Sequence, residues 1–306
     1  MRIRRDARSP IIAAAAAAAV ATAFVSGIAG AQTPLAAPIP APAAPERVPL
    51  AENFSTAEIA VIAGAAVGGG FLLALGHTVL PEPTPSLGAP HAGSLDRRLT
   101  DRLHLDDGSG GRFLGGVPAV AGIYVLPFLP AAYYGAQLTR GWPRPDVNAD
   151  HRLLAFAEAL GWTMLVTGAT KYLVGRSRPY VELGRPELRA SKTGEADLSF
   201  FSGHSSAMFC AASFVARDAG GIAIPAAAYA TATLVAVSRV IDQQHWPSDV
   251  LMGALVGGLT AHLVYTIHFD GNRRPRRRRA PSRDAGAAAA RIIPTAGGIA
   301  VAGLLP

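Results

Sequence analysis

Cysteine and charged residues are both scarce in this chain of 306 residues. Its only cysteine, Cys210, excludes an internal disulfide and any metal cluster held by several thiolates. Charged residues make up 16% of the sequence and hydrophobic residues 50%, which excludes an intrinsically disordered protein. Because Cys210 stands in the apolar stretch Met-Phe-Cys-Ala-Ala-Ser, we expect it to be a small residue of the core.

Alternation of apolar and polar residues with period two is also lacking, which excludes a β-sheet core and predicts a helical one. The apolar residues instead form six runs, at residues 57–80, 113–138, 152–174, 204–217, 220–238 and 249–268. The first run follows a capping-box pattern at Ser55 and Glu58, and its length of about 20 residues is enough to cross a bilayer.

Small residues and proline are abundant, with 33 glycines and 24 prolines, which suits helices that pack closely in a membrane. We therefore predict an all-α protein, a membrane-embedded bundle of about six core helices. A soluble helical bundle is the alternative, because the fourth run is short and several runs owe their apolar character to alanine and glycine. Only the C-terminal tail, residues 291–306, allows a short strand.

The net charge of +7 comes mostly from one short cluster, formed by Arg273, Arg274, Arg276, Arg277, Arg278 and Arg279. A basic cluster directly after a hydrophobic span is typical of a segment that faces the anionic inner surface of a membrane, and less typical of a nucleic-acid reader. We therefore expect a membrane as partner and no nucleic acid, and we infer no obligate protein partner.

The N-terminus predicts export. A basic start and an Ala-rich apolar run lead to the triplet Ala29-Gly30-Ala31, which indicates a signal peptide cleaved before Gln32. An uncleaved membrane anchor is the alternative. The predicted domains are the signal peptide at 1–31, a Pro/Ala-rich linker without a fold at 32–50, a helical domain at 51–270 with its motifs within 150–268, and the basic cluster and tail at 271–306.

The polar segments between the apolar runs are unequal. Residues 81–112 and 139–151 are expected to be ordinary loops. The segment 175–203 holds several cations beside apolar spans, which indicates a site for an anion. These cations are Arg176, Arg178, Arg185, Arg189 and Lys192.

Lys171 and Arg178 are the first candidate site residues. They lie seven residues apart, so two helical turns place them on one face of a helix that we expect Pro179 to stop. Both cations would then lie near the end of that helix. The alternative is a lysine and an arginine that extend toward the water at a membrane boundary.

Ser202, Gly203 and His204 stand where the fourth apolar run begins. Small residues at a helix start expose unpaired N–H groups, and the helix dipole adds positive character there. We therefore predict an anion-binding turn with a proton donor, His204, beside it. The alternative is that Ser202 is simply a helix cap.

The third stretch, Ser238 to Asp249, reads Ser-Arg-Val-Ile-Asp-Gln-Gln-His-Trp-Pro-Ser-Asp. Pro247 suits the first turn of the last helix, which places His245 at the helix mouth. Asp249 is then expected to hydrogen-bond one ring nitrogen of His245 and leave the other as a nucleophile. Arg239 adds a cation, although a histidine and an aspartate at this spacing are common by chance.

All three stretches lie at boundaries of apolar runs, and such ends can converge in a helical bundle. Together they supply two histidines, one carboxylate, three cations and a helix N-terminus, which are the groups needed to bind a phosphate and to attack it. A Ser-His-Asp hydrolase is less apt, because three cations do little for a neutral ester. A metal site lacks its third protein ligand.

The order, spacings and placement of these residues resemble the signature of the type 2 phosphatidic acid phosphatase / vanadium haloperoxidase superfamily. The three parts are Lys171-x6-Arg178-Pro179, Ser202-Gly203-His204 and Ser238-Arg239-x5-His245-x3-Asp249. Phe201 stands where this family usually has proline, which bears on the shape of the turn and not on a catalytic group. The resemblance implies a helical bundle whose active site lies at the helix ends.

The resemblance also implies a role for each residue. His245 attacks phosphorus and becomes a phosphohistidine, Asp249 orients it, and His204 protonates the leaving oxygen and then activates water. The implied phosphate ligands are Lys171, Arg178, Arg239, the hydroxyl of Ser202 and the amide of Gly203. The family works without a metal, so we expect no cofactor.

We therefore expect a metal-independent phosphatase that cleaves phosphate monoesters or diphosphates, chiefly of lipids. A vanadium-dependent haloperoxidase, a soluble periplasmic acid phosphatase and a membrane protein without activity are the alternatives. The six residues between Lys171 and Arg178 disfavour the haloperoxidase, and the presence of both histidines disfavours the inactive protein. We expect a bacterial-type cell envelope location, in the inner membrane with the site facing the periplasm, or else a periplasmic, membrane-associated protein.

Overall fold

The structure is a computed structural model that describes residues 47–81, 83, 94–103, 122, 125–139, 146–183, 194–277, 291–295 and 298–302. The predicted signal peptide, most of the predicted linker, and Arg278 and Arg279 of the basic cluster lie outside the described residues. The described end of the linker packs on the helical domain: Val48 is buried, and its N–H donates to Asn148 Oδ1 at 3.1 Å.

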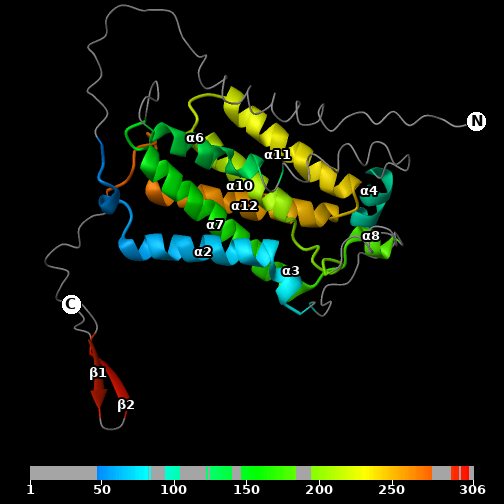
Figure 1. Cartoon of the computed structure of the whole chain (residues 1–306), viewed down its shortest axis with the longest axis horizontal. Coiled ribbons are helices and arrows are strands. Elements are labelled where there is room, and N and C mark those ends of the chain that lie inside the picture. Colours follow the sequence, from blue (N-terminus) through cyan, green and yellow to red (C-terminus); the bar gives the residue numbers. More distant parts are fainter. Residues whose placement is uncertain are drawn as a thin grey trace, which may run out of the picture.

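Long helices, packed side by side, form the domain, so the predicted all-α bundle is confirmed (Figure 1). The principal helices are α2 (Thr56–Ala74), α6 (Leu129–Gln137), α7 (Ala149–Val174), α10 (Gly203–Asp218), α11 (Ala223–Ile241) and α12 (Pro247–His268). Shorter helical elements are η1 (Leu50–Glu52), α3 (Gly76–Val79), α4 (Leu95–Leu103), η2 (Leu126–Phe128) and α8 (Pro179–Glu182).

A small hairpin stands apart from the bundle, formed by the antiparallel strands β1 (Arg291–Thr295) and β2 (Gly298–Ala302) (Figure 1). Its register places Arg291 opposite Ala302. It lies in the tail, the one place where the sequence allowed a strand.

Helix α10 lies at the centre of the bundle, in contact with α7, α11 and α12. Its apolar side chains join a core that includes Phe156, Phe214 and Tyr265, and Cys210 is fully buried there, which confirms its expected place. Glycine lets α12 approach closely: a Cβ on Gly257 would lie 2.0 Å from the carbonyl oxygen of Ser206 on α10. Close packing of small residues thus holds the central helices together.

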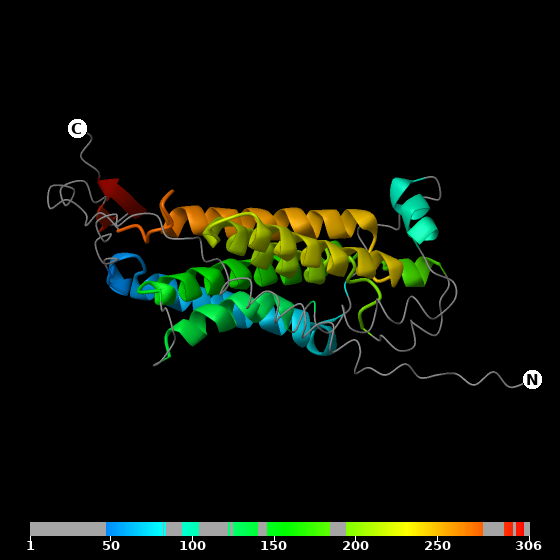
Figure 2. The same ribbon diagram turned by 90° about the horizontal axis from the view of Figure 1, so that it is seen from above.

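The helices alternate in direction so that several of their ends meet. Helices α2, α7 and α11 end, and α10 and α12 begin, at one end of the bundle, where α3, α4 and α8 also lie (Figures 1 and 2). We call this the site end. The opposite end carries the start of α7 and the last residues of α10 and α12, including Asp218 and His268.

Helix α7 ends earlier than the sequence indicated. Gly175 takes the left-handed conformation, with φ 56°, and its N–H donates to the carbonyl of Lys171, which closes the helix after Val174. Pro179 is the first residue of α8 and does not terminate α7. The prediction that Lys171 and Arg178 share one helical face is therefore wrong, because a glycine cap ends the helix between them.

The segment 81–112 was expected to be an ordinary loop, and this is wrong for residues 95–103, which form α4. Ser94 begins this helix, where its hydroxyl accepts the N–H of Arg97 at 3.2 Å. The sequence pattern behind this helix is weak, because only Leu95, Leu99 and Leu103 are apolar at helical spacing.

Helices in the described part of the chain offer four candidate membrane spans, at Thr56–Ala74, Ala149–Glu182, Ala223–Ile241 and Pro247–His268. Helix α10 has 16 residues, fewer than the roughly 20 that a full crossing needs, and other helices surround it. The outer face of α12 carries a stripe of exposed aliphatic side chains at a spacing of four: Leu251, Leu255, Leu259, Leu263 and Ile267. Such a surface suits contact with lipid.

Candidate active site

The three predicted motifs converge at the site end, around a cavity of about 460 Å³. Six of the eight predicted site residues line it: Lys171, Arg178, Gly203, His204, Arg239 and His245. The other two, Ser202 and Asp249, are fully buried behind the cavity wall. The fold thus brings together residues that lie more than 70 positions apart in the sequence.

His245 lies in the tight connection between α11 and α12. Its backbone N–H and that of Gln244 both donate to the carbonyl of Arg239, at 3.2 and 3.0 Å, which folds the chain back on itself. The ring Nδ1 lies 2.8 Å from the carbonyl oxygen of Ser199. Because a carbonyl only accepts, Nδ1 carries the hydrogen and Nε2 holds the lone pair.

Burial lowers the pKa of His245 well below its ordinary value. The cations Lys171, Arg178 and Arg239 lower this pKa further, and the carbonyl of Ser199 opposes them. His245 is therefore neutral near pH 7, which is the state in which an imidazole can act as a nucleophile.

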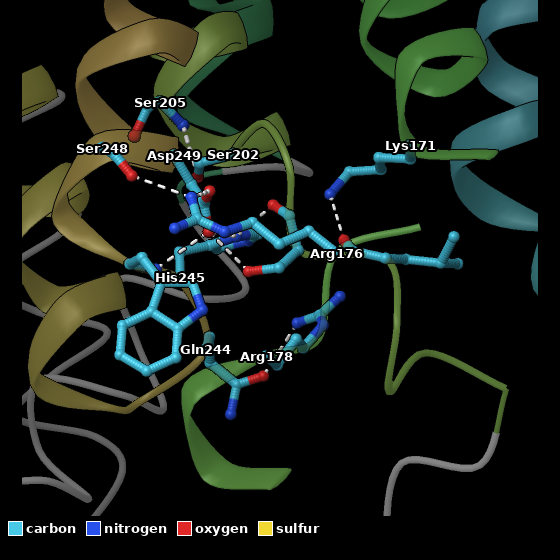
Figure 3. A network of polar contacts seen from close by, with 12 residues as sticks. Lys171, Arg176, Arg178, Ser202, Ser205, Gln244, His245, Ser248 and Asp249 are labelled. Carbon is cyan, nitrogen blue, oxygen red and sulfur yellow. Dashed lines mark hydrogen bonds and ion pairs between the residues drawn. The ribbon is translucent and has the colours of Figure 1, made fainter. Parts of the chain in front are cut away.

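Asp249 does not make the hydrogen bond to His245 that the sequence predicted. Its Oδ2 lies 3.9 Å from Nδ1 of His245 and instead accepts the hydroxyl of Ser199 at 2.5 Å and the N–H of Trp246 at 2.9 Å. Its Oδ1 pairs with Arg176 at 2.5 Å (Figure 3). Asp249 therefore positions His245 indirectly. It binds Trp246, the residue after His245, and it binds Ser199, whose carbonyl accepts the ring N–H of His245.

The cations of the first motif are held in place by main-chain and side-chain oxygens. Lys171, in the last turn of α7, donates to the carbonyl of Leu198 at 2.5 Å. Arg178 donates from Nε to the carbonyl of Glu195 at 2.8 Å and from NH1 to the amide oxygen of Gln244 at 3.0 Å (Figure 3). Their charges face the cavity from two different elements, α7 and the start of α8.

Arg239 brings a third cation to the cavity from the end of α11. Its guanidinium pairs with Asp242 at 2.7 Å and also donates to the hydroxyl of Ser238. Glu195, which also lines the cavity, pairs with Arg178 at 3.1 Å. Three cations at the wall of one cavity favour an anion, such as a phosphate or a similar group, as ligand.

Ser202 caps helix α10, where its hydroxyl accepts the N–H of Ser205 at 3.4 Å. Its own N–H donates to the carbonyl of Asp249 at 3.0 Å, which ties the second motif to the third. Gly203 and His204, the next two residues, line the cavity. In this structure the hydroxyl of Ser202 is a helix cap, while the first turn of α10 faces the site.

Three residues of this end were not assigned to the site by sequence. The sequence indicates Arg176 only as one of the cations of its segment, gives no signal for Ser199, and predicts a loop around Asp96. The side chain of Arg176 is 8% exposed and joins the carboxylates of Asp96 and Asp249. Its place within the first motif was a usable signal, whereas nothing in the sequence around Asp96 pointed to the site.

One wall of the cavity is apolar. It is formed by Gly70, Leu72, Leu73 and Ala74 of α2 together with Phe128 and Met164. Phe201 does not line the cavity; it is 3% exposed and packs edge-on against Phe200, with ring centroids 5.8 Å apart. We therefore assign the ring of Phe201 to packing and not to contact with a lipid chain.

Groups of three or more His, Cys, Asp or Glu side chains that could hold a metal ion are not found among the described residues. The acidic residues near the site are paired with arginines: Asp249 and Asp96 contact Arg176, and Asp242 contacts Arg239. The cavity lining itself holds the cations Lys171, Arg178 and Arg239 and one carboxylate, Glu195, which pairs with Arg178 at 3.1 Å.

Comparison with known proteins gives two kinds of similarity. Residues 152–273 match the sequence model of the PAP2 superfamily. The chain is 33% identical over 137 residues to a lipid A 1-phosphatase of Porphyromonas gingivalis, an alignment that covers 43% of this chain and 28% of that protein. It is 31% identical over 134 residues to a PA-phosphatase related-family protein of Dictyostelium discoideum, covering 39% of this chain and 49% of the relative. Each alignment therefore spans less than half of the relative's length.

Proposed function

Because residues 152–273 match the model of the PAP2 superfamily, we propose that this chain is a phosphatase that cleaves lipid phosphate monoesters or diphosphates through a phosphohistidine. The observation that carries this proposal is the cavity at the site end. It places a neutral, fixed imidazole beside three buried cations and gives the same space an apolar wall. These features suit a substrate with a phosphate at one end and a hydrocarbon chain at the other.

In the first step, Nε2 of His245 attacks phosphorus, so that a P–N bond forms as the P–O bond to the leaving group breaks. His204 donates a proton to the departing oxygen. Lys171, Arg178 and Arg239 bind the other phosphoryl oxygens and stabilise the charge that develops on them. The first-turn amides of α10, beginning at Gly203, add partial positive charge.

In the second step, His204 takes a proton from water, and the oxygen of that water attacks the phosphohistidine. The P–N bond breaks, and inorganic phosphate leaves with His245 neutral again. Nδ1 of His245 keeps its hydrogen on the carbonyl of Ser199 throughout, which holds Nε2 toward the cavity. Asp249 stabilises the positive charge of the intermediate through Ser199 and Trp246.

Four helices long and apolar enough to cross a membrane, and the similarity to a lipid A 1-phosphatase, support a membrane location, and we propose that the site faces away from the cytoplasm. Helix α12 has 22 residues and spans about 33 Å from the site end to the opposite end. Beyond its last residue the chain carries Arg273, Arg274, Arg276 and Arg277. Basic residues next to a span favour the cytoplasmic side, so the site would lie on the other side, facing the periplasm.

A phosphate-release panel tests the proposal. The purified chain in detergent would be given phosphatidate, a prenyl diphosphate and a short soluble phosphate monoester, each with and without EDTA. We expect release from a lipid substrate, faster than from the soluble ester and unaffected by EDTA. Activity that EDTA abolishes and a divalent ion restores would count against this mechanism.

A further inference from the structure

A carboxylate far from the three motifs in the sequence contacts residues of the site end without lining the cavity. Asp96 is the second residue of α4, which lies beyond the site ends of α11 and α12 (Figures 1 and 2). Its Oδ1 accepts the N–H of Ser248 at 2.8 Å, and its Oδ2 accepts the hydroxyl of Ser248 at 2.5 Å. Oδ2 also pairs with Arg176 at 3.0 Å.

These contacts close the first turn of α12. Ser248 is the second residue of that helix, so its N–H has no partner within the helix. Asp249 accepts the N–H of Trp246 at 2.9 Å, and Asp96 accepts that of Ser248. Two carboxylates therefore cap the helix that begins two residues after His245, and each is favoured there by the helix dipole.

Arg176 joins the two carboxylates. Its NH2 binds Asp96 and its NH1 binds Asp249, and its guanidinium lies over the ring of Trp246 with 5.9 Å to the centroid. The guanidinium is planar, so fixing one of its nitrogens on Asp96 fixes the direction of the other. Asp249 in turn holds Ser199, whose carbonyl accepts Nδ1 of His245. A continuous series of contacts thus runs from Asp96 to the proposed nucleophile.

We propose that Asp96 is a positioning residue for His245, which acts through Arg176 and Ser248 on Asp249. The inference rests on the proposed function of this site. Neither Asp96 nor Arg176 lines the cavity, whereas Lys171, Arg178 and Arg239 do. Loss of Asp96 should therefore change the placement of the nucleophile more than the binding of the phosphate.

Steady-state kinetics on the full chain test this. Asp96→Ala should lower kcat about 100-fold, the scale expected when a reacting group is misplaced by about 1 Å, and should change KM less than about twofold. Asp101→Ala is the matched control, because Asp101 is exposed on the same helix and should leave both constants unchanged. In the double variant Asp96→Ala/Ser248→Ala, the fold-loss in kcat should be less than the product of the two single fold-losses, because both substitutions remove the same contact.

Asp96→Asn covers the case in which Asp96→Ala does not fold. Its amide oxygen can still accept the N–H of Ser248, while the negative charge that pairs with Arg176 is lost. We expect a clear loss of kcat in this variant as well. A kcat within about twofold of wild type per folded enzyme, or a rise in KM alone, would overturn the proposal.

Nuclear magnetic resonance separates this inference from the proposed function. In protein labelled with 15N-histidine, the ring signals of His245 are assigned by their loss in His245→Gln. We expect Asp96→Asn to shift these signals and Asp101→Ala to leave them in place. If the wild type released no phosphate but the signals moved as expected, the function would fail and the positioning role would stand. Unchanged His245 signals beside normal wild-type activity would refute the positioning role alone.

Discussion

Both ends of the helical bundle hold arginines with little exposed surface, but the arginines of the two ends have different surroundings. At the opposite end, Arg152 pairs with Asp218 at 2.8 Å and with Asp146 at 2.6 Å. The hydroxyls of Tyr134 and Tyr265 donate to the same Asp218, at 2.8 and 3.0 Å. At this end Arg152, Asp146 and Asp218 are therefore all paired with oppositely charged side chains of the protein.

At the site end Arg178 and Arg239 also pair with carboxylates, Glu195 and Asp242, but the cations here border open space. Lys171, Arg178 and Arg239 face a cavity of about 460 Å³, and Lys171 is bound to a main-chain carbonyl, not to a carboxylate. A satisfied network of charges fixes two helices relative to each other, whereas cations beside a cavity are ready to bind an anion. The comparison shows that open space beside the cations, not the presence of arginine, distinguishes a binding site from a structural network.

The strongest test of the site end is His245→Ala, because it removes the proposed nucleophile. We expect phosphate release from every substrate to fall to background while the protein still folds. Thermal unfolding in detergent serves as the control for folding. Near-native turnover in this variant would show that another group attacks phosphorus.

His204→Ala should have the next largest effect. A general acid contributes about 10²–10⁴-fold, and most when the leaving group is a poor one. We expect a large loss with an alkyl phosphate and a small loss with 4-nitrophenyl phosphate, whose leaving group needs no proton. Equal losses with both substrates would contradict the role of His204 as acid.

Arg152→Met tests the opposite end. The pair with Asp218 is partly buried, with side chains 12% and 14% exposed, so its loss leaves the carboxylate poorly compensated and should cost about 1–3 kcal/mol of the free energy of unfolding. The kcat per folded enzyme should stay unchanged, because Arg152 lies far from the cavity. Arg47→Met is the control: its pair with Asp150, at 3.4 Å, involves a side chain that is 72% exposed, so little stability should be lost. A loss of kcat in folded Arg152→Met would show that the two ends are coupled.

Gly70→Leu tests the apolar wall of the cavity. A Cβ at this position meets no atom within 4 Å, so the new side chain would project into the space along α2. We expect about a tenfold loss in kcat/KM for a long-chain lipid phosphate and little change for the soluble ester. Gly64→Leu is the control. It adds the same helix propensity at an equally open position of α2 that does not line the cavity, so kcat/KM for both substrates should stay unchanged. Equal effects on the two substrates would exclude a chain-binding role for this wall.

The pH dependence of His245 gives the smallest expected effect. Because its pKa lies below the ordinary value, the ring should stay neutral, and able to attack, as the pH falls through the range where a free histidine becomes charged. Protonation at lower pH then removes the nucleophile. Arg239→Met takes away one of the cations that lower this pKa, so the 15N titration of His245 should move to higher pH. A titration that does not move would show that Arg239 has no influence on the ring.

Short-range patterns in the sequence were sufficient to predict the helical fold and six of the residues that line the cavity. The helical core followed from the apolar runs, the resemblance to the superfamily followed from motif spacing, and the comparisons confirm it. The convergence of six of the eight predicted residues on one cavity agrees with that interpretation, while their individual roles remain predictions. Errors arose at local boundaries: Gly175 ended a helix that was expected to reach Pro179, and α4 formed in a predicted loop.

By itself, the sequence determined the chemistry available to this protein: two histidines, a set of cations and helices with apolar faces. Only the tertiary structure decided how these groups are held. In the folded protein Nδ1 of His245 binds the carbonyl of Ser199 and not the carboxylate of Asp249. Asp96 contacts Ser248 at the start of α12, 152 positions later in the sequence. The physical reason is that motif spacing reports neighbours along one helix, whereas a buried polar group binds whichever partner the packing of several helices places within about 3 Å.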